Sequence, residues 1–217
     1  FASVTVTAEG RNKDERADDD VADDVHFHVD ASAHEGGAWV NDPAGWKYCY
    51  TDSTCAKGPL AIGADSYYFD ENGILGTGWV NYDGAWHWLG TSGRIATGWG
   101  KVADAWYYMD NSGAMTTGWT QVRGSWFYLA DSGKMATGWT KIGDSWYYFQ
   151  ESGAMATGWV NDGGSWYYLN ASGKMATGWL NVGGSWYYLS PSGVMLTGTQ
   201  VINGRTYVFD ANGKWVG

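Results

Sequence analysis

Short apolar segments separated by glycine-containing turns recur every 20 residues from position 79 to position 198. In residues 159–169, two segments rich in aromatic and β-branched side chains flank Gly163-Gly164, a pair suited to a type I′ hairpin turn. A Ser-Gly pair near the end of each unit, such as Ser172-Gly173, indicates a second turn. The pattern therefore predicts one β-hairpin in every unit.

The turn position also predicts which side chains share a face of the hairpin. With Gly163-Gly164 as the loop, Trp159 pairs with Tyr168 and Asn161 with Trp166, and side chains alternate along each strand. One face is then aromatic, with Trp159, Trp166 and Tyr168. The other is apolar, with Val160, Tyr167 and Leu169. Because a lone hairpin is marginally stable, the apolar faces are expected to be buried by stacking, which gives an all-β solenoid of stacked β-hairpins.

The aromatic face is more constant than the apolar one. Its two tryptophans and one tyrosine persist through five successive units, whereas the apolar position of Leu169 holds Met109, Leu129 or Phe149 elsewhere. The constant aromatic positions have two interpretations, an aromatic core or a face that recognises a ligand. Core positions usually tolerate exchange between residues of similar volume. We favour ligand recognition because the strict positions are the aromatic ones.

A quaternary ammonium group suits such a face. It has no hydrogen-bond donor and is held by the negative faces of aromatic rings. A sugar would also stack on tryptophan, but sugar sites add fixed polar side chains, and the Asn161 position is Lys101, Gln121 or Lys141 in other units.

Charge and hydropathy argue against a nucleic-acid partner and against a membrane span. Residues 1–38 contain 10 acidic and 3 basic side chains, and the whole chain carries a formal net charge of −10. A groove for single-stranded nucleic acid needs a positive lining beside its aromatic rings, so no nucleic-acid partner is expected. No segment approaches the 18 or so consecutive apolar residues of a membrane span.

The sequence TGWVNDGGSWYYLNASGKMA at residues 157–176 resembles the choline-binding repeat of pneumococcal surface proteins and cell-wall hydrolases. The resemblance covers residues 39–217, in units that start near 39, 59, 79, 99, 119, 139, 159, 179 and 199. It implies a solenoid that binds the phosphocholine of teichoic and lipoteichoic acid. Each choline would lie between consecutive hairpins, against two tryptophans of one unit and a tyrosine of the next.

Carried over residue by residue, the resemblance predicts five regular boxes. We number them 1 to 5, and they are Trp79, Trp86 and Tyr108; Trp99, Trp106 and Tyr128; Trp119, Trp126 and Tyr148; Trp139, Trp146 and Tyr168; and Trp159, Trp166 and Tyr188. A methionine is a candidate fourth wall of each box, although simple gap-filling explains it equally well; these residues are Met115, Met135, Met155, Met175 and Met195.

The pattern changes toward both ends. Trp39, Trp46 and Tyr68 give a further box, whereas Pro59 and Ser66 replace both tryptophans of the next unit, where no ligand is expected. At the C-terminal side, Trp179 and Trp186 lack a closing tyrosine because Val208 takes its position, and Trp215 in the methionine position is expected to substitute for it or to cap the end.

Residues 1–38 are predicted to form a separate acidic segment. His26-Phe27-His28-Val29 aligns with the Trp-Tyr-Tyr-Leu of later units and suggests a decayed repeat. His26, His28 and His34 with Asp30 and Glu35 could instead suggest a metal site, but no ligand spacing is specific and we expect none.

Cys49 and Cys55 are the only cysteines and are expected to form a structural disulfide, because an even number of cysteines in an extracellular chain favours pairing. A redox-active pair is the alternative.

The function expected from the sequence is that of a non-catalytic surface protein of the bacterial cell wall, with choline as ligand, no cofactor, and a host protein as a candidate second partner. Residues 1–38 are too few for the hydrolase domain that relatives often carry and contain no hydrolase motif. Virulence and adhesion are the associated roles, and both a monomer and a homodimer are compatible with the sequence. The alternatives are a glucan-like carbohydrate-binding module and the wall-binding part of a hydrolase whose catalytic domain is absent.

Overall fold

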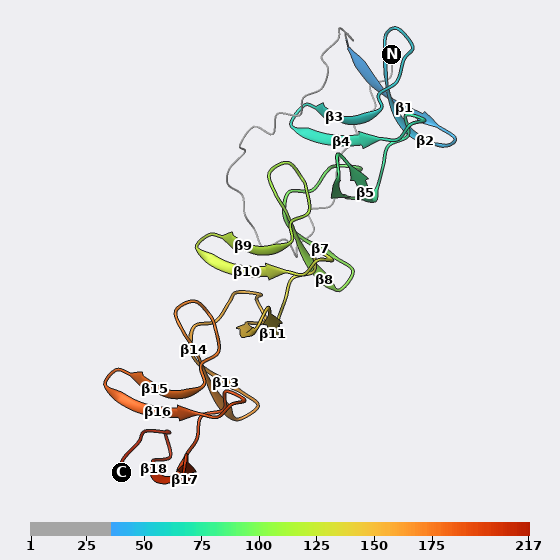
Figure 1. The fold of residues 1–217 in the computed structure, drawn as a ribbon. Helices are drawn as coiled ribbons and strands as arrows, with labels where there is room; N and C mark the ends of the chain where they lie inside the picture. The colour runs from blue at the N-terminus through green and yellow to red at the C-terminus, as the bar shows by residue number, and fades with distance from the viewer. Residues whose placement is uncertain (1–35) are drawn as a thin grey trace. The chain divides into compact units, whose positions relative to one another are not determined.

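The computed structural model describes residues 36–217, and its regular elements are all β-strands (Figure 1). Consecutive strands pair into nine two-stranded sheets, so the predicted succession of stacked hairpins is confirmed. No helix within residues 36–217 is long and apolar enough to cross a membrane. The strands are β1 Gly37–Asp42, β2 Gly45–Tyr50, β3 Gly58–Ile62, β4 Asp65–Phe69, β5 Gly78–Tyr82, β6 Ala85–Leu89, β7 Gly98–Val102, β8 Ala105–Met109, β9 Gly118–Val122, β10 Ser125–Leu129, β11 Gly138–Ile142, β12 Ser145–Phe149, β13 Gly158–Asp162, β14 Ser165–Leu169, β15 Gly178–Val182, β16 Ser185–Leu189, β17 Gly198–Ile202 and β18 Arg205–Phe209.

The hairpin β13–β14 has the predicted turn and register. Gly163 and Gly164 have φ angles of 56° and 84°, the left-handed conformation that type I′ requires at both central positions. Trp159 pairs with Tyr168, and Asn161 with Trp166. The predicted alternation of the two faces follows from this register.

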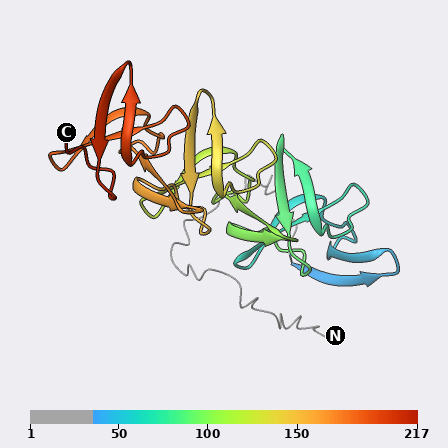
Figure 2. The same cartoon turned by 90° about the horizontal axis from the view of Figure 1, so that it is seen from below.

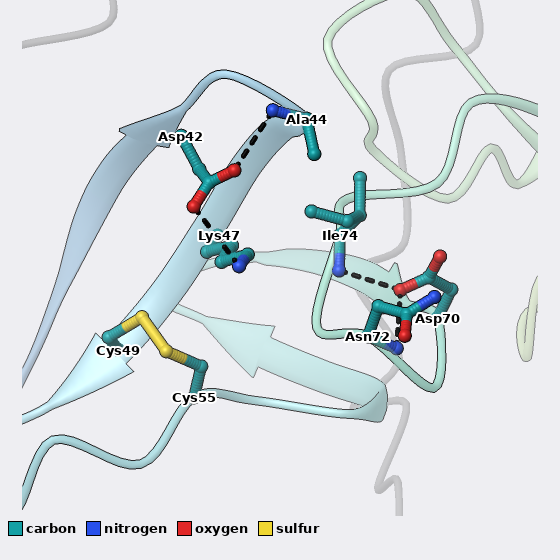
Figure 3. A network of polar contacts seen from close by, with 8 residues as sticks. All are labelled: Asp42, Ala44, Lys47, Cys49, Cys55, Asp70, Asn72 and Ile74. Carbon is teal, nitrogen blue, oxygen red and sulfur yellow. Dashed lines mark hydrogen bonds and ion pairs between the residues drawn. A yellow bond between two sulfur atoms is a disulfide. The ribbon is translucent and has the colours of Figure 1, made fainter.

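The loops between hairpins are closed by side chains as well as by the backbone. Asp70 Oδ1 accepts hydrogen bonds of 2.8 Å from the backbone N–H groups of both Asn72 and Ile74 (Figure 3). Asn170 Oδ1 accepts the equivalent pair of hydrogen bonds from the backbone N–H groups of Ser172 and Lys174. These Asx turns satisfy backbone donors that the short sheets leave unpaired, so each loop leads into the next hairpin in a fixed geometry.

Cys49 and Cys55 form a disulfide bond in the loop that follows β1–β2 (Figure 3). The two residues also form an isolated antiparallel bridge, the place that Leu169 and Met175 take in a regular unit. The disulfide therefore replaces an apolar contact at the point where the array becomes irregular.

The chain divides into two compact units. Of the described residues, the first contains 36–118 with 129–135, and the second contains 119–128 with 136–217. Within the second unit, hairpins that are three apart in the chain point in the same direction. The hairpins β11–β12 and β17–β18 point the same way in Figure 2, and β9–β10 and β15–β16 do so in Figure 1.

The apolar faces form a ladder of buried side chains, as the predicted stacking requires. In seven of the nine hairpins the last residue of the second strand is completely buried; these residues are Phe69, Leu89, Met109, Leu129, Phe149, Leu169 and Leu189. The first tyrosine of the Trp-Tyr-Tyr sequence is buried beside them, with Tyr147 at 7% exposure and Tyr187 at 9%. Stacking therefore removes from water the face that a lone hairpin would expose.

The hairpin β5–β6 packs differently from its neighbours. Its His87 replaces the usual buried tyrosine, and its Tyr82 takes a position that is valine or isoleucine in most other repeats. The rings of Tyr82 and His87 stack with centroids 3.8 Å apart, and Tyr68 of the preceding hairpin stacks on Tyr82 at 4.8 Å. This three-ring stack connects the hairpins β3–β4 and β5–β6, where Pro59 and Ser66 replace the two tryptophans.

The suspected decayed repeat at residues 26–29 and the histidine cluster of residues 26–35 lie outside the described residues. Within residues 36–217, no group of three or more histidine, cysteine or acidic side chains could hold a metal ion.

Candidate functional site

Box 3 shows how one hairpin presents its two tryptophans. The rings of Trp119 and Trp126 lie 6.3 Å apart and are inclined by 84°. Their side chains belong to opposite strands of β9–β10 and are 38% and 42% exposed. Two large apolar rings therefore remain accessible to solvent at right angles to one another, which is unusual unless a ligand uses them.

The backbone brings the tyrosine of the next hairpin to the same box. The N–H of Met155 donates to the carbonyl of Trp126 at 2.7 Å, and the N–H of Ala156 donates to the carbonyl of Tyr148 at 2.8 Å. Because Met155 and Ala156 are adjacent, the two bonds connect Trp126 of one hairpin to Tyr148 of the following one. The methionine lies at the point of connection.

The same pair of bonds recurs in three other predicted boxes. In each, the methionine N–H donates to the second tryptophan and the following residue donates to the tyrosine, at 2.7–2.9 Å. These residues are Met115, Thr116, Trp86 and Tyr108 in box 1; Met175, Ala176, Trp146 and Tyr168 in box 4; and Met195, Leu196, Trp166 and Tyr188 in box 5. Trp86, Trp146 and Trp166 are 42–48% exposed, like Trp126.

Box 2 is described only in part. Trp99, Trp106 and Met135 belong to the first unit, and the N–H of Met135 donates to the carbonyl of Trp106 at 2.8 Å. Tyr128 belongs to the second unit, and its place in this box stays a prediction.

The N-terminal box has the same framework with leucine in the methionine position. Leu75 donates to the carbonyl of Trp46 at 2.7 Å, and Gly76 donates to that of Tyr68 at 2.8 Å. The ring of Trp39 lies 5.4 Å from Tyr48 of its own hairpin and 5.0 Å from Tyr67 of the next. Since Tyr68 also stacks on Tyr82, one face of its ring is already covered.

The first tryptophan of several repeats has a structural contact with the next hairpin that the repeat pattern alone does not predict. Trp119 packs edge-on against the buried Tyr147 of the next hairpin, with ring centroids 4.9 Å apart. Trp139 and Tyr167 repeat this contact at 4.7 Å. The sequence signal is the residue that directly follows the second tryptophan, which is tyrosine in most repeats although alternation along the strand places it on the apolar face.

The methionines are half-buried and have a packing role as well. A side chain added at Gly173 would overlap with the sulfur of Met155, so this methionine fills the space above the following Ser-Gly turn. Gly193 and Met175 have the same relation. Gap-filling is therefore a contact that the structure shows for these methionines, and their role as a fourth wall stays a prediction.

Charged groups near the boxes differ from one box to another. In box 4, the carboxylate of Asp162 accepts a hydrogen bond of 3.0 Å from Nε1 of Trp139, and Lys141 pairs with Trp146 across the two strands. Aromatic faces with no charge common to all boxes attract a large, poorly hydrated cation more than an ion that needs directed hydrogen bonds.

A scan against protein-family models matches the choline-binding repeat at residues 96–137, 136–177 and 176–216, and a putative cell wall binding repeat at residues 77–95. The chain belongs to the choline-binding repeat family. This membership confirms the resemblance found in the sequence. No curated protein sequence matches the chain.

Similar solved structures come from choline-binding proteins. CbpJ from Streptococcus pneumoniae is 40% identical, with a TM-score of 0.73 over 79% of this chain and 62% of that one. Choline binding protein F, CbpF, from the same species is 39% identical, with a TM-score of 0.71 over 79% and 61%. CbpF in complex with ipratropium is 36% identical, with a TM-score of 0.69 over 80% and 64%. The chain thus spans less than two thirds of these proteins.

Proposed function

We propose that this choline-binding repeat protein is a non-catalytic surface protein that attaches to the phosphocholine of bacterial teichoic and lipoteichoic acid. The observation that carries the proposal is the exposed second tryptophan that recurs in boxes 1, 3, 4 and 5, each linked by adjacent backbone hydrogen bonds to the tyrosine of the following hairpin. In box 3 the two tryptophan rings are also nearly perpendicular. Choline ends in a trimethylammonium group, which aromatic faces attract without directed hydrogen bonds.

The family and its relatives support this ligand. Residues 77–95 match a putative cell wall binding repeat, and CbpF has been solved in complex with ipratropium, whose cationic centre is also a quaternary ammonium. The ligand class therefore agrees with the chemistry of the boxes.

Several weak boxes in one chain fit a polymeric ligand. Each cation–π contact contributes on the order of 0.5–2 kcal/mol, so three contacts less the cost of immobilisation give an affinity on the order of millimolar. Teichoic acid carries many cholines, and binding at one box raises the effective concentration at the others.

A fluorescence titration tests the ligand class. Choline should quench or shift the tryptophan emission at millimolar concentrations, because the paired indoles are the walls of the boxes. Glucose oligomers at the same concentrations should leave the emission unchanged, since no polar side chain recurs on the aromatic face. Equal responses to both would favour the carbohydrate-binding module instead.

A further inference from the structure

We propose that Trp179, Trp186, Val208 and Trp215 form a quaternary-ammonium site in which the aromatic and aliphatic walls have exchanged places. In a regular box the tyrosine position supplies the third ring and the methionine position the aliphatic wall. Here Val208 stands in the tyrosine position and Trp215 in the methionine position. The proposal rests on the proposed function, because it assigns the same class of ligand to a further site.

The backbone of this site is that of a regular box. The N–H of Trp215 donates to the carbonyl of Trp186 at 2.8 Å, and the N–H of Val216 donates to that of Val208 at 2.8 Å. Met155 and Ala156 make the same two bonds in box 3. Trp215 also bridges to Phe209, as Met155 bridges to Phe149. Both exchanged residues are therefore held at the wall positions of the regular framework.

The rings have the arrangement of a box rather than that of a buried core. Trp179 and Trp186 lie 6.3 Å apart at 81°, against 6.3 Å and 84° for Trp119 and Trp126 of box 3. The ring of Trp215 lies 5.9 Å from that of Trp179, inclined by 71°.

All four walls of the proposed site remain accessible. Trp179, Trp186, Trp215 and Val208 are 38%, 44%, 45% and 40% exposed. The ring centroids of Trp215 and Tyr207 lie 6.2 Å apart, so Trp215 does pack on the last hairpin. That packing alone does not explain why so much of the Trp215 ring stays exposed.

The exchange keeps the number of aromatic rings and of aliphatic walls that would surround a cation. The site has three rings and one aliphatic wall, as a regular box does, and tryptophan is the strongest cation–π partner among the aromatic residues. Lys214 precedes Trp215 just as Lys174 precedes Met175, so a lysine at this position is shared with box 4. We therefore expect an affinity for choline within about tenfold of a regular box.

Indole N–H signals in NMR spectra can report on each box separately. They would be assigned by single tryptophan-to-phenylalanine substitutions and followed while choline is added to the full chain. The signals of Trp186 and Trp215 should shift with choline and saturate within about tenfold of the concentration that saturates Trp126. If Trp126 responds and these two do not, the exchanged box is wrong and the proposed function stands. If no indole responds, both fail.

Two variants test the exchange itself. Trp215→Met leaves two rings and should weaken choline binding at Trp186 on the order of tenfold, without changing the response of Trp126. Adding Val208→Tyr to Trp215→Met rebuilds a regular box and should restore the response. Near-ultraviolet circular dichroism would verify that both variants fold. Unchanged binding in Trp215→Met, or no recovery in the double variant, would overturn the assignment of Trp215 as a wall.

Discussion

Trp119 and Trp126 belong to the same hairpin but have different surroundings. The ring of Trp119 packs on Tyr147 at 4.9 Å and on Phe149 at 5.8 Å, so its constancy has a structural cause in addition to any ligand. Trp126 is 42% exposed, and the one ring that it touches in the described structure is that of Trp119. The second tryptophan of each unit is therefore the stronger evidence for a ligand.

Asp162 should strengthen choline binding at box 4 in a way that depends on salt. Its carboxylate accepts the indole N–H of Trp139, at a position that is Val182 beside box 5. A negative charge about 4 Å from a cation contributes about 1 kcal/mol in water, so Asp162→Asn should weaken choline binding at Trp139 by about fivefold or less. High salt should remove the difference. The indole signals of Trp139 and Trp159 provide the measurement and its internal control; equal losses at both would contradict a local charge effect.

The hairpin, its register and the ladder of buried residues could be predicted from the sequence because each depends on local spacing. The type I′ turn at Gly163-Gly164 determines which residues pair, and alternation then determines the faces. The stack of Tyr68, Tyr82 and His87 could not be predicted in this way. In this stack, rings from two hairpins pack together where Pro59 takes a tryptophan position. Which rings meet depends on distances in space, and the 20-residue spacing in the sequence does not determine them.

His87 should make the stability of the first unit depend on pH. Burial lowers the pKa of His87, although the backbone at Gly113 and the carboxylates of Asp110 and Asp83 oppose this effect. The unfolded chain, with a histidine pKa near 6.5, then binds the proton more readily than the folded chain. Stability should therefore be unaffected above about pH 7 and decrease as the pH falls below about 6.5, until the lower folded pKa is passed.

Thermal unfolding at pH 7.5 and pH 5 would measure this effect. The matched variant His87→Phe keeps a ring in the stack and all other histidines of the chain. It should show a smaller loss of melting temperature between the two pH values than the parent chain does. Identical losses in the two proteins would assign the pH dependence to other groups.

At the scale of the whole molecule, the number of boxes matters more than the affinity of any one. Binding at several boxes of one chain multiplies weak contacts through effective concentration, by on the order of 100-fold or more. Attachment to the wall should therefore tolerate the loss of one box and yield to free choline at millimolar concentrations.

Removing the second tryptophans one at a time tests this multivalent model. Trp126→Ala should reduce retention on choline-containing walls only modestly, whereas combining it with Trp146→Ala and Trp166→Ala should abolish retention. These side chains are 42–43% exposed, so their loss should leave the hairpin cores folded, which circular dichroism would verify. Complete loss of retention from Trp126→Ala alone, in a folded protein, would show that a single site dominates.

The aromatic boxes are proposed to select a positive charge surrounded by methyl groups. A comparison of choline with 3,3-dimethylbutan-1-ol tests this selection, because the alcohol has the same shape with carbon in place of the charged nitrogen. Equilibrium titration followed by tryptophan fluorescence should show saturation by choline at millimolar concentrations. The neutral compound should bind on the order of tenfold more weakly or worse, because burial of its methyl groups remains while the cation–π attraction is lost. Equal binding of the two compounds would contradict recognition of the charge by the aromatic rings.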